Sequence, residues 1–193
     1  MKTKSEINTL QLERVSIFKR GIAAIFDIYI SSVLAHIPIL FIYSIETGET
    51  QITKQLSRLS KISGILACLL GTLMVLLYYV ILPVYKFEGQ TLAKKLLGFK
   101  VVKIDGSPVD LNTMIKREVI GSMIVEGGLV SSGDLLRQLI LIITSSDLIY
   151  TGLLYISFGT TILSIIFAVF SKRNRALHDY IGGTKVLSIK EEC

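Results

Sequence analysis

The chain has 193 residues, 51% of them hydrophobic, and a formal net charge of +6. Its mean hydropathy of +0.61 and its three long apolar runs exclude an ordinary soluble domain, since so short a chain could hardly bury three apolar helices. The basic residues gather at the edges of these runs, and no nucleic-acid-binding motif accompanies them, so we expect a bilayer and not a nucleic acid as the partner.

The first apolar run indicates a transmembrane helix. About 20 predominantly apolar residues cross a bilayer, and residues 21–43 contain a single formal charge, Asp27. The run follows a mostly polar segment, 1–19, and is too long for the core of a signal peptide. We therefore predict a cytoplasmic segment over 1–19, followed by an uncleaved first span and a single membrane domain over 20–190.

The second apolar run, 62–85, carries no formal charge and is predicted to span. Its small residues are spaced for close packing between helices; they are Gly64, Ala67, Cys68 and Gly71. The tyrosines near its end are predicted to anchor the helix at the membrane interface; they are Tyr78, Tyr79 and Tyr85.

The basic segment 86–117 is predicted to be cytoplasmic and folded. Thr91 can cap a short helix that stops before Gly98, with its leucines against the membrane and Lys94 and Lys95 directed to headgroups or water. The turn Asp105-Gly106 between β-forming residues predicts a hairpin over 99–110. We expect the tail strand 184–189 to pair with it, and an unstructured tail is the alternative.

The last apolar run, 148–170, is again free of formal charge and is followed by a basic tail. Because the N-terminus, segment 86–117 and the tail should all be cytoplasmic, the number of crossings must be even. We place the missing crossing at 115–131, followed by a turn at 131–134 and a short interfacial or re-entrant helix at 135–143. A re-entrant hairpin is the alternative. Glu126, beside two glycines, marks either a broken helix lining a cavity or, as we favour, a helix end near the outer interface.

The charge inside the first span needs a partner. Insertion of an ionised carboxylate into the membrane interior costs about 2.5 kcal/mol or more of free energy. Arg20, seven residues earlier, shares a helix face with Asp27 but lies about 10 Å away along the helix axis. A second basic or polar group, or water, must therefore complete the arrangement. After the last span, the spacing of Arg175 and Asp179 predicts a local salt bridge. Alternatively, these two residues and His178 fold back beside Arg20.

These residues resemble the RDD family of membrane proteins, which is named for an arginine at the start of the first span, an aspartate seven residues later and a second aspartate near the end. Arg20, Asp27 and Asp179 match them. The resemblance continues through Gly89-Gln-Thr-Leu-Ala-Lys-Lys-Leu-Leu-Gly98, Lys116-Arg-Glu118, Arg175-Ala-Leu-His-Asp179 and Gly183-Thr184. It implies a membrane domain for which transport of unidentified ligands, with ion or proton exchange among the proposals, has been suggested. It implies no reaction and no established cofactor.

The leading hypothesis is a transporter in the plasma membrane, with both termini cytoplasmic. Asp27 would be the protonatable or cation-binding carboxylate, Arg20 would modulate it, and Asp179 would contribute to a cytoplasmic gate. Accessory roles are expected for Arg175, His178, Arg117, Glu118 and Glu126. So small a protomer would form a homo-oligomer with the path between subunits.

Two alternatives remain. Arg20, Asp27 and Asp179 could form one structural clamp in a non-transport assembly, regulatory or anchoring protein, whose cytoplasmic sheet contacts a partner or anionic lipid headgroups. An enzyme is disfavoured because HExxH, GxSxG, Walker and CxxC motifs are absent from the sequence. We therefore expect no catalytic residue, no metal and no cofactor.

Overall fold

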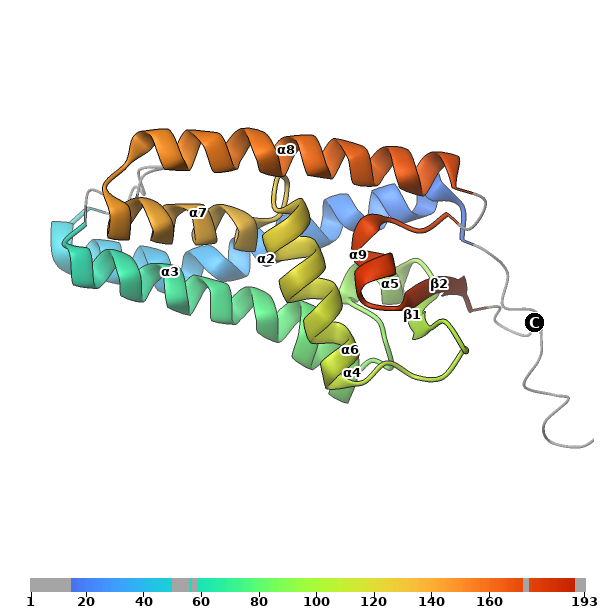
Figure 1. Cartoon of the computed structure of the whole chain (residues 1–193). Coiled ribbons are helices and arrows are strands. Elements are labelled where there is room, and N and C mark those ends of the chain that lie inside the picture. Colours follow the sequence, from blue (N-terminus) through green and yellow to red (C-terminus); the bar gives the residue numbers. More distant parts are fainter. Residues whose placement is uncertain (1–14, 50–55, 57–58, 172–173, 190–193) are drawn as a thin grey trace, which may run out of the picture.

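Long apolar helices make up most of the protein. The computed structural model describes residues 15–49, 56, 59–171 and 174–189. Three candidate spans run along the bundle in Figure 1: α2 (Ile17–Thr47), the continuous helix Lys61–Tyr85, and α8 (Asp147–Phe170). Their lengths of 31, 25 and 24 residues exceed the 20 or so that a bilayer needs. The predicted helical membrane fold is confirmed.

The second span changes its winding near one end. It consists of α3 (Lys61–Leu76), a π-helical turn η2 (Leu77–Ile81) and α4 (Leu82–Tyr85). Pro83 lacks an N–H and its ring collides with the preceding turn of a regular α-helix, so the wider π turn next to it accommodates the proline. The altered winding also places Tyr78 inside the bundle, where it is buried.

The fourth candidate span is broken. It is formed by α6 (Leu111–Ile115) with the π-helical segment η3 (Lys116–Glu126), and by α7 (Ser131–Thr144), which is bent by 60° from the first half. Figure 1 shows η3 in one half of the bundle and α7, between α3 and α8, in the other. Together with the three unbroken helices, this pair makes up to four candidate spans.

The local structure around the break differs from the prediction. Residues 131–134 do not form a turn but the first winding of α7, and 135–143 pack inside the bundle instead of at its interface. Gly127 ends η3 in the left-handed conformation, at φ 45°, and a side chain at Gly133 would come within 2.3 Å of the Gly127 carbonyl oxygen. The small residues that resemble a turn therefore allow two half-helices to meet.

A two-stranded sheet closes one end of the bundle. Strand β1 (Phe99–Lys103) pairs antiparallel with β2 (Thr184–Ser188), with Val101 opposite Val186, as predicted. The expected return arm of the hairpin makes a single bridge, between Val102 and Pro108. The short helices α5 (Leu92–Leu96), capped by Thr91 as predicted, and α9 (Leu177–Ile181) lie beside the sheet. We call this end, where α2 begins and α8 ends, the sheet end.

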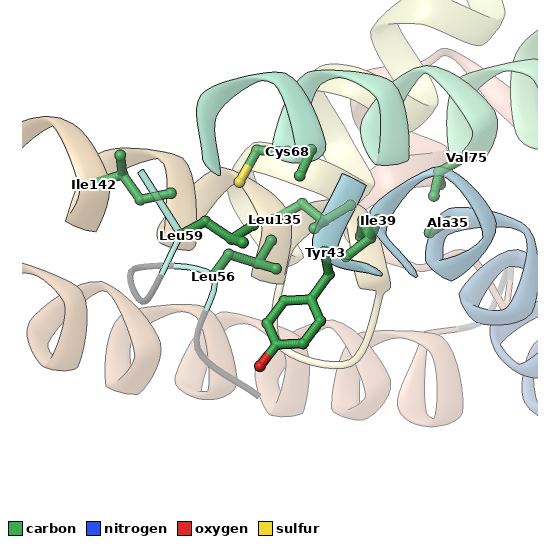
Figure 2. Close-up of a cluster of buried hydrophobic side chains, with 10 residues drawn as sticks. Ala35, Ile39, Tyr43, Leu56, Leu59, Cys68, Val75, Leu135 and Ile142 are labelled. Atoms are coloured by element: carbon green, nitrogen blue, oxygen red, sulfur yellow. The ribbon is translucent and has the colours of Figure 1, made fainter. Parts of the chain in front are cut away.

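The larger apolar cluster lies in the half away from the sheet, and Figure 2 shows its side chains in close-up. There Ala35, Ile39 and Tyr43 of α2 pack against α3 and Leu135 of α7. A side chain at Gly71 would come within 3.0 Å of Ile39 and 2.9 Å of Leu135, so the predicted close packing of small residues on the second span is confirmed. A second cluster, around Phe99, Val101 and Met114, joins the sheet to the bundle. The second cluster contains Ala23 of α2, Val80 of the second span and Ala93 of α5, and so packs together the elements that carry the sheet-end charges.

Candidate functional site: a charged cavity at the sheet end

Asp27 is completely enclosed by donors from the second span and from α5. Its side chain is 1% exposed. One carboxylate oxygen accepts from the Tyr78 hydroxyl, and the other accepts from Thr91 Oγ1 at 2.6 Å and Lys94 Nζ at 2.7 Å. The second basic group that the first span requires is therefore Lys94. The predictions that Lys94 extends to headgroups and that Tyr78 anchors the interface are both wrong.

Asp179 pairs with arginines from two other elements. Its carboxylate accepts from Arg20 Nη2 at 2.6 Å and from Arg117 Nη2 at 3.1 Å, and its side chain is fully buried. Burial opposes ionisation, but the charges of His178, Arg117 and Arg20 prevail and hold the pKa of Asp179 well below its usual range. This contact joins the start of α2, the broken span and the tail, as the fold-back alternative required.

Arg175 does not form the predicted salt bridge with the Asp179 carboxylate. Its Nε donates to the Thr184 carbonyl oxygen at 2.9 Å, and its Nη2 donates to the Asp179 carbonyl oxygen at 2.7 Å. The guanidinium also stacks over the Tyr180 ring, 4.1 Å from the centroid. Arg175 therefore joins α9 to β2 and fixes the backbone that presents Asp179.

Glu126 lies at the break between the two half-helices of the fourth candidate span. Its carboxylate accepts from Ser164 Oγ at 2.6 Å and from the His178 backbone N–H at 2.8 Å, and His178 Nδ1 lies 2.9 Å from it. The favoured position near the outer interface is wrong, and the broken helix lining a cavity is observed. A side chain at Gly121 would come within 2.7 Å of His178 Cβ, so this glycine lets α9 approach the broken helix.

A cavity of about 450 Å³ connects these groups. It lies between α2, η3 and α8, with apolar residues such as Ile25, Ile28, Ile165 and Val169 on one side. Its charged wall consists of seven side chains: Arg20, Asp27, Lys94, Arg117, Glu118, Glu126 and His178. Arg117 also donates to Glu118, and both are buried. Asp179 and Arg175 support this wall without lining the cavity: Asp179 pairs with Arg20 and Arg117, and Arg175 donates to the Asp179 carbonyl oxygen.

The chain matches the RDD family over residues 14–183. It belongs to the RDD family. A relative is the uncharacterized protein YckC of Bacillus subtilis (strain 168), 29% identical over 166 residues, which cover 85% of this chain and 78% of the relative. No solved structure matches the chain significantly.

The three residues that give the RDD family its name do not form one clamp in this member. Arg20 contacts Asp179, while Asp27 contacts Lys94, so the arginine and the aspartate on the same face of α2 have different partners. One contact ties α2 to the tail, and the other ties it to α5. Neither ion pair is complete without a residue from outside the first span.

A second polar cluster, in the other half of the bundle, was not foreseen. Arg137 of α7 is 4% exposed; its Nη1 donates to the Gly127 carbonyl oxygen at 2.8 Å and its Nη2 contacts Asp134 at 3.3 Å. Asp134 also accepts from Gln138 at 2.9 Å and from Tyr150 at 3.4 Å. The spacing of Asp134, Arg137 and Gln138 on one helix face could have revealed this cluster. Because the helix was predicted at the membrane interface, where water solvates charged side chains, its charges did not indicate that they needed partners.

The described residues contain no group of three or more His, Cys, Asp or Glu side chains placed to hold a metal ion. The carboxylates of the cavity are each matched by donors from the protein.

Proposed function

We propose that this RDD-family protein is a membrane transporter of a small ion or ligand, with its path along the broken fourth span. The observation that carries the proposal is a charged cavity whose inner end is a helix break. Discontinuous helices within a bundle commonly line substrate and ion sites, and ionisable groups at membrane depth usually belong to a pathway or a relay.

The polar groups follow one another along the bundle in support of this path. Arg117 and Glu118 lie at the sheet end, and Glu126 with His178 lies at the break. Beyond the break, Thr161 Oγ1 accepts from the Gly128 N–H at 3.1 Å, and the Arg137 cluster follows in the other half. A purely structural clamp would not need polar groups in both halves of the bundle.

Of the three carboxylates on the cavity, Glu118 is buried in its ion pair with Arg117. Glu126 supports exchange better than either Glu118 or Asp27. The Glu126 side chain keeps 13% of its surface exposed, whereas that of Asp27 keeps 1% and accepts from three donors, one of them a lysine. A carboxylate that exchanges a proton for a cation must be reachable by both. We therefore assign the exchange role to Glu126 and a structural role to Asp27, and we propose no enzymatic role.

The orientation follows from the basic residues of the sheet end. Lys95, Lys100, Lys103 and Lys185 lie on α5 and the sheet, which favours this end as the cytoplasmic one, with both termini there and the protein in the plasma membrane. On α5, Leu96 is exposed beside Lys95, an arrangement that suits contact with the headgroups of an anionic leaflet. The cavity lies within one protomer, so a homo-oligomer is compatible with the path but not required for it.

The other candidate is an anchoring or assembly protein without transport. The saturated contacts of Asp27 and Asp179 favour it, because groups matched so fully by internal donors can serve the fold alone. Under this alternative the partial exposure of Glu126 to the cavity serves no purpose, which is the reason that we rank the alternative second.

The test is proton movement in proteoliposomes under imposed sodium, potassium or lithium gradients. We expect the wild type to move protons and Glu126→Gln to move none. Asp110→Asn is the matched control, because Asp110 is an exposed carboxylate that pairs with Lys103 and caps α6, and asparagine caps equally well. No proton movement in the wild type with any of these cations, or equal movement in Glu126→Gln, would refute the exchange mechanism.

A further inference from the structure

The cavity joins two kinds of surface. Its charged wall is described above, and the opposite side is formed by residues that also face outward, where lipid surrounds a membrane protein: Ile25 is 69% exposed, and Ile165 and Val169 are about half exposed. Helices α2 and α8, which carry these residues, scarcely contact one another. The cavity is therefore open to the bilayer between α2 and α8.

The polar and apolar parts are ordered along the membrane normal as they are in a lipid. Arg20 lies near the start of α2 at the sheet end, and Ile25 and Ile28 lie about 7.5 and 12 Å further along the helix axis. On α8, Val169 is next to the last residue and Ile165 lies one turn deeper. A headgroup at Arg20 would therefore leave its chain beside apolar side chains.

Arg20 supplies spare donors to the charged wall. The wall's carboxylates already have partners within the protein: Asp27 accepts at both oxygens, Glu126 accepts at Oε1 and Glu118 pairs with Arg117. A guanidinium has five N–H donors, and Arg20 uses one toward the Asn174 carbonyl oxygen and one toward Asp179 among the described residues. Its side chain is 14% exposed and lines the cavity. The unused donors of Arg20 therefore suit an anionic headgroup.

We infer that the cavity binds a single-chain anionic amphiphile from the bilayer, with its carboxylate or phosphate at Arg20 and its acyl chain between α2 and α8. A volume of about 450 Å³ lies in the range of sites for small organic ligands. The inference rests on the proposed function in that it uses the same cavity as the binding site. Binding without an ion gradient is measured independently of transport.

Two glycines provide a matched pair of variants. Gly21 lines the cavity, Gly159 of α8 does not, and a side chain at either position would meet nothing within 4 Å. Both lie in helices, where replacing glycine favours the helix. Gly21→Phe therefore fills the cavity mouth, and Gly159→Phe adds the same ring to the outer surface without filling it.

The experiment is electron paramagnetic resonance of spin-labelled stearic acid with the full-length protein in nanodiscs of a neutral lipid. The motionally restricted fraction reports binding. We expect the methyl ester of the same probe to bind about tenfold more weakly, since it loses the charged partner of Arg20. Gly21→Phe should abolish the restricted fraction of the acid, and Gly159→Phe should preserve it.

A probe with a phosphate headgroup distinguishes the two possible sources of the ligand, a lysophospholipid and a free fatty acid. Spin-labelled lysophosphatidic acid, which also has one acyl chain, assigns the site to a lysophospholipid if it is restricted more strongly than stearic acid, and the reverse assigns the site to free fatty acid. Equal binding of acid and ester, equal effects of the two phenylalanine variants, or full displacement of the acid by inorganic phosphate alone would overturn the inference. Binding in a protein that moves no ions would refute the exchange mechanism and leave this inference standing.

Discussion

Replacement of Asp27 by asparagine should destabilise the protein strongly. The Asp27 carboxylate is buried and accepts from Tyr78, Thr91 and Lys94, so Asp27→Asn leaves a lysine without its counter-charge. Breaking a buried ion pair from one side costs about 3–5 kcal/mol. Because the Lys94 side chain keeps 13% exposure, we take the lower limit, about 3 kcal/mol, which corresponds to a fall in Tm of about 6–12 °C for a chain of this size.

The assay uses the buried thiol of Cys68 as a reporter of unfolding. In a Cys193→Ser background, a thiol-reactive dye labels Cys68 when the bundle opens on heating. Asp110→Asn should leave the Tm unchanged, because that carboxylate is exposed. The double variant Asp27→Asn/Lys94→Met should lose less than the sum of the single variants, because removal of both partners leaves no uncompensated charge. A wild-type Tm in Asp27→Asn, or strictly additive losses, would refute the structural role of this pair.

Three further predictions concern the other contacts of the site. Folding lowers the pKa of Asp179, so its contribution to stability is complete above the unfolded pKa of about 3.9 and is lost as the pH falls toward the lower folded pKa. The Tm of the wild type should therefore decrease when the pH is lowered below about 4, whereas the Tm of Asp179→Asn, which is already lower at pH 7, should change less over that range. Parallel curves of Tm against pH for the two proteins would contradict this. Gly121→Ala introduces a methyl group within 2.7 Å of His178 Cβ and should cost about 1–3 kcal/mol, and a wild-type Tm would show that α9 does not pack there. Arg137→Met removes the donor to the Gly127 carbonyl oxygen and should lower the Tm, with Arg137→Lys intermediate; equal Tm values for all three proteins would exclude a role for Arg137 at the break.

The unbroken spans could be predicted from the sequence because their apolar runs are long enough to cross a bilayer by themselves. The small sheet was also predictable, since β-forming residues lie in both basic segments and a turn signal, Asp105-Gly106, follows those of the first. The broken span was not. Its small residues, such as Gly127 and Gly133, resemble a loop, and only the contact between the two half-helices shows that they serve close packing.

Most members of the site were predictable from the sequence, but Lys94 and the pairing of the charges were not. The cost of a buried charge indicates that Asp27 needs a partner, and helix periodicity places Arg20 on the same face. Neither argument identifies Lys94, which is 67 residues away in the chain, or assigns Arg20 to Asp179. Long-range pairing depends on how α5 and the tail dock, and a single sequence does not specify it.

The central claim is that the Glu126 carboxylate exchanges protons for cations, whereas the Asp27 carboxylate stabilises the fold. The most direct test measures proton flux and unfolding temperature together for Glu126→Gln and Asp27→Asn in the same liposome preparation, with flux expressed per folded protein. We predict that Glu126→Gln remains folded and moves no protons, while Asp27→Asn unfolds at a lower temperature but keeps its flux per folded molecule. Loss of flux in folded Asp27→Asn, with wild-type flux in Glu126→Gln, would contradict the account.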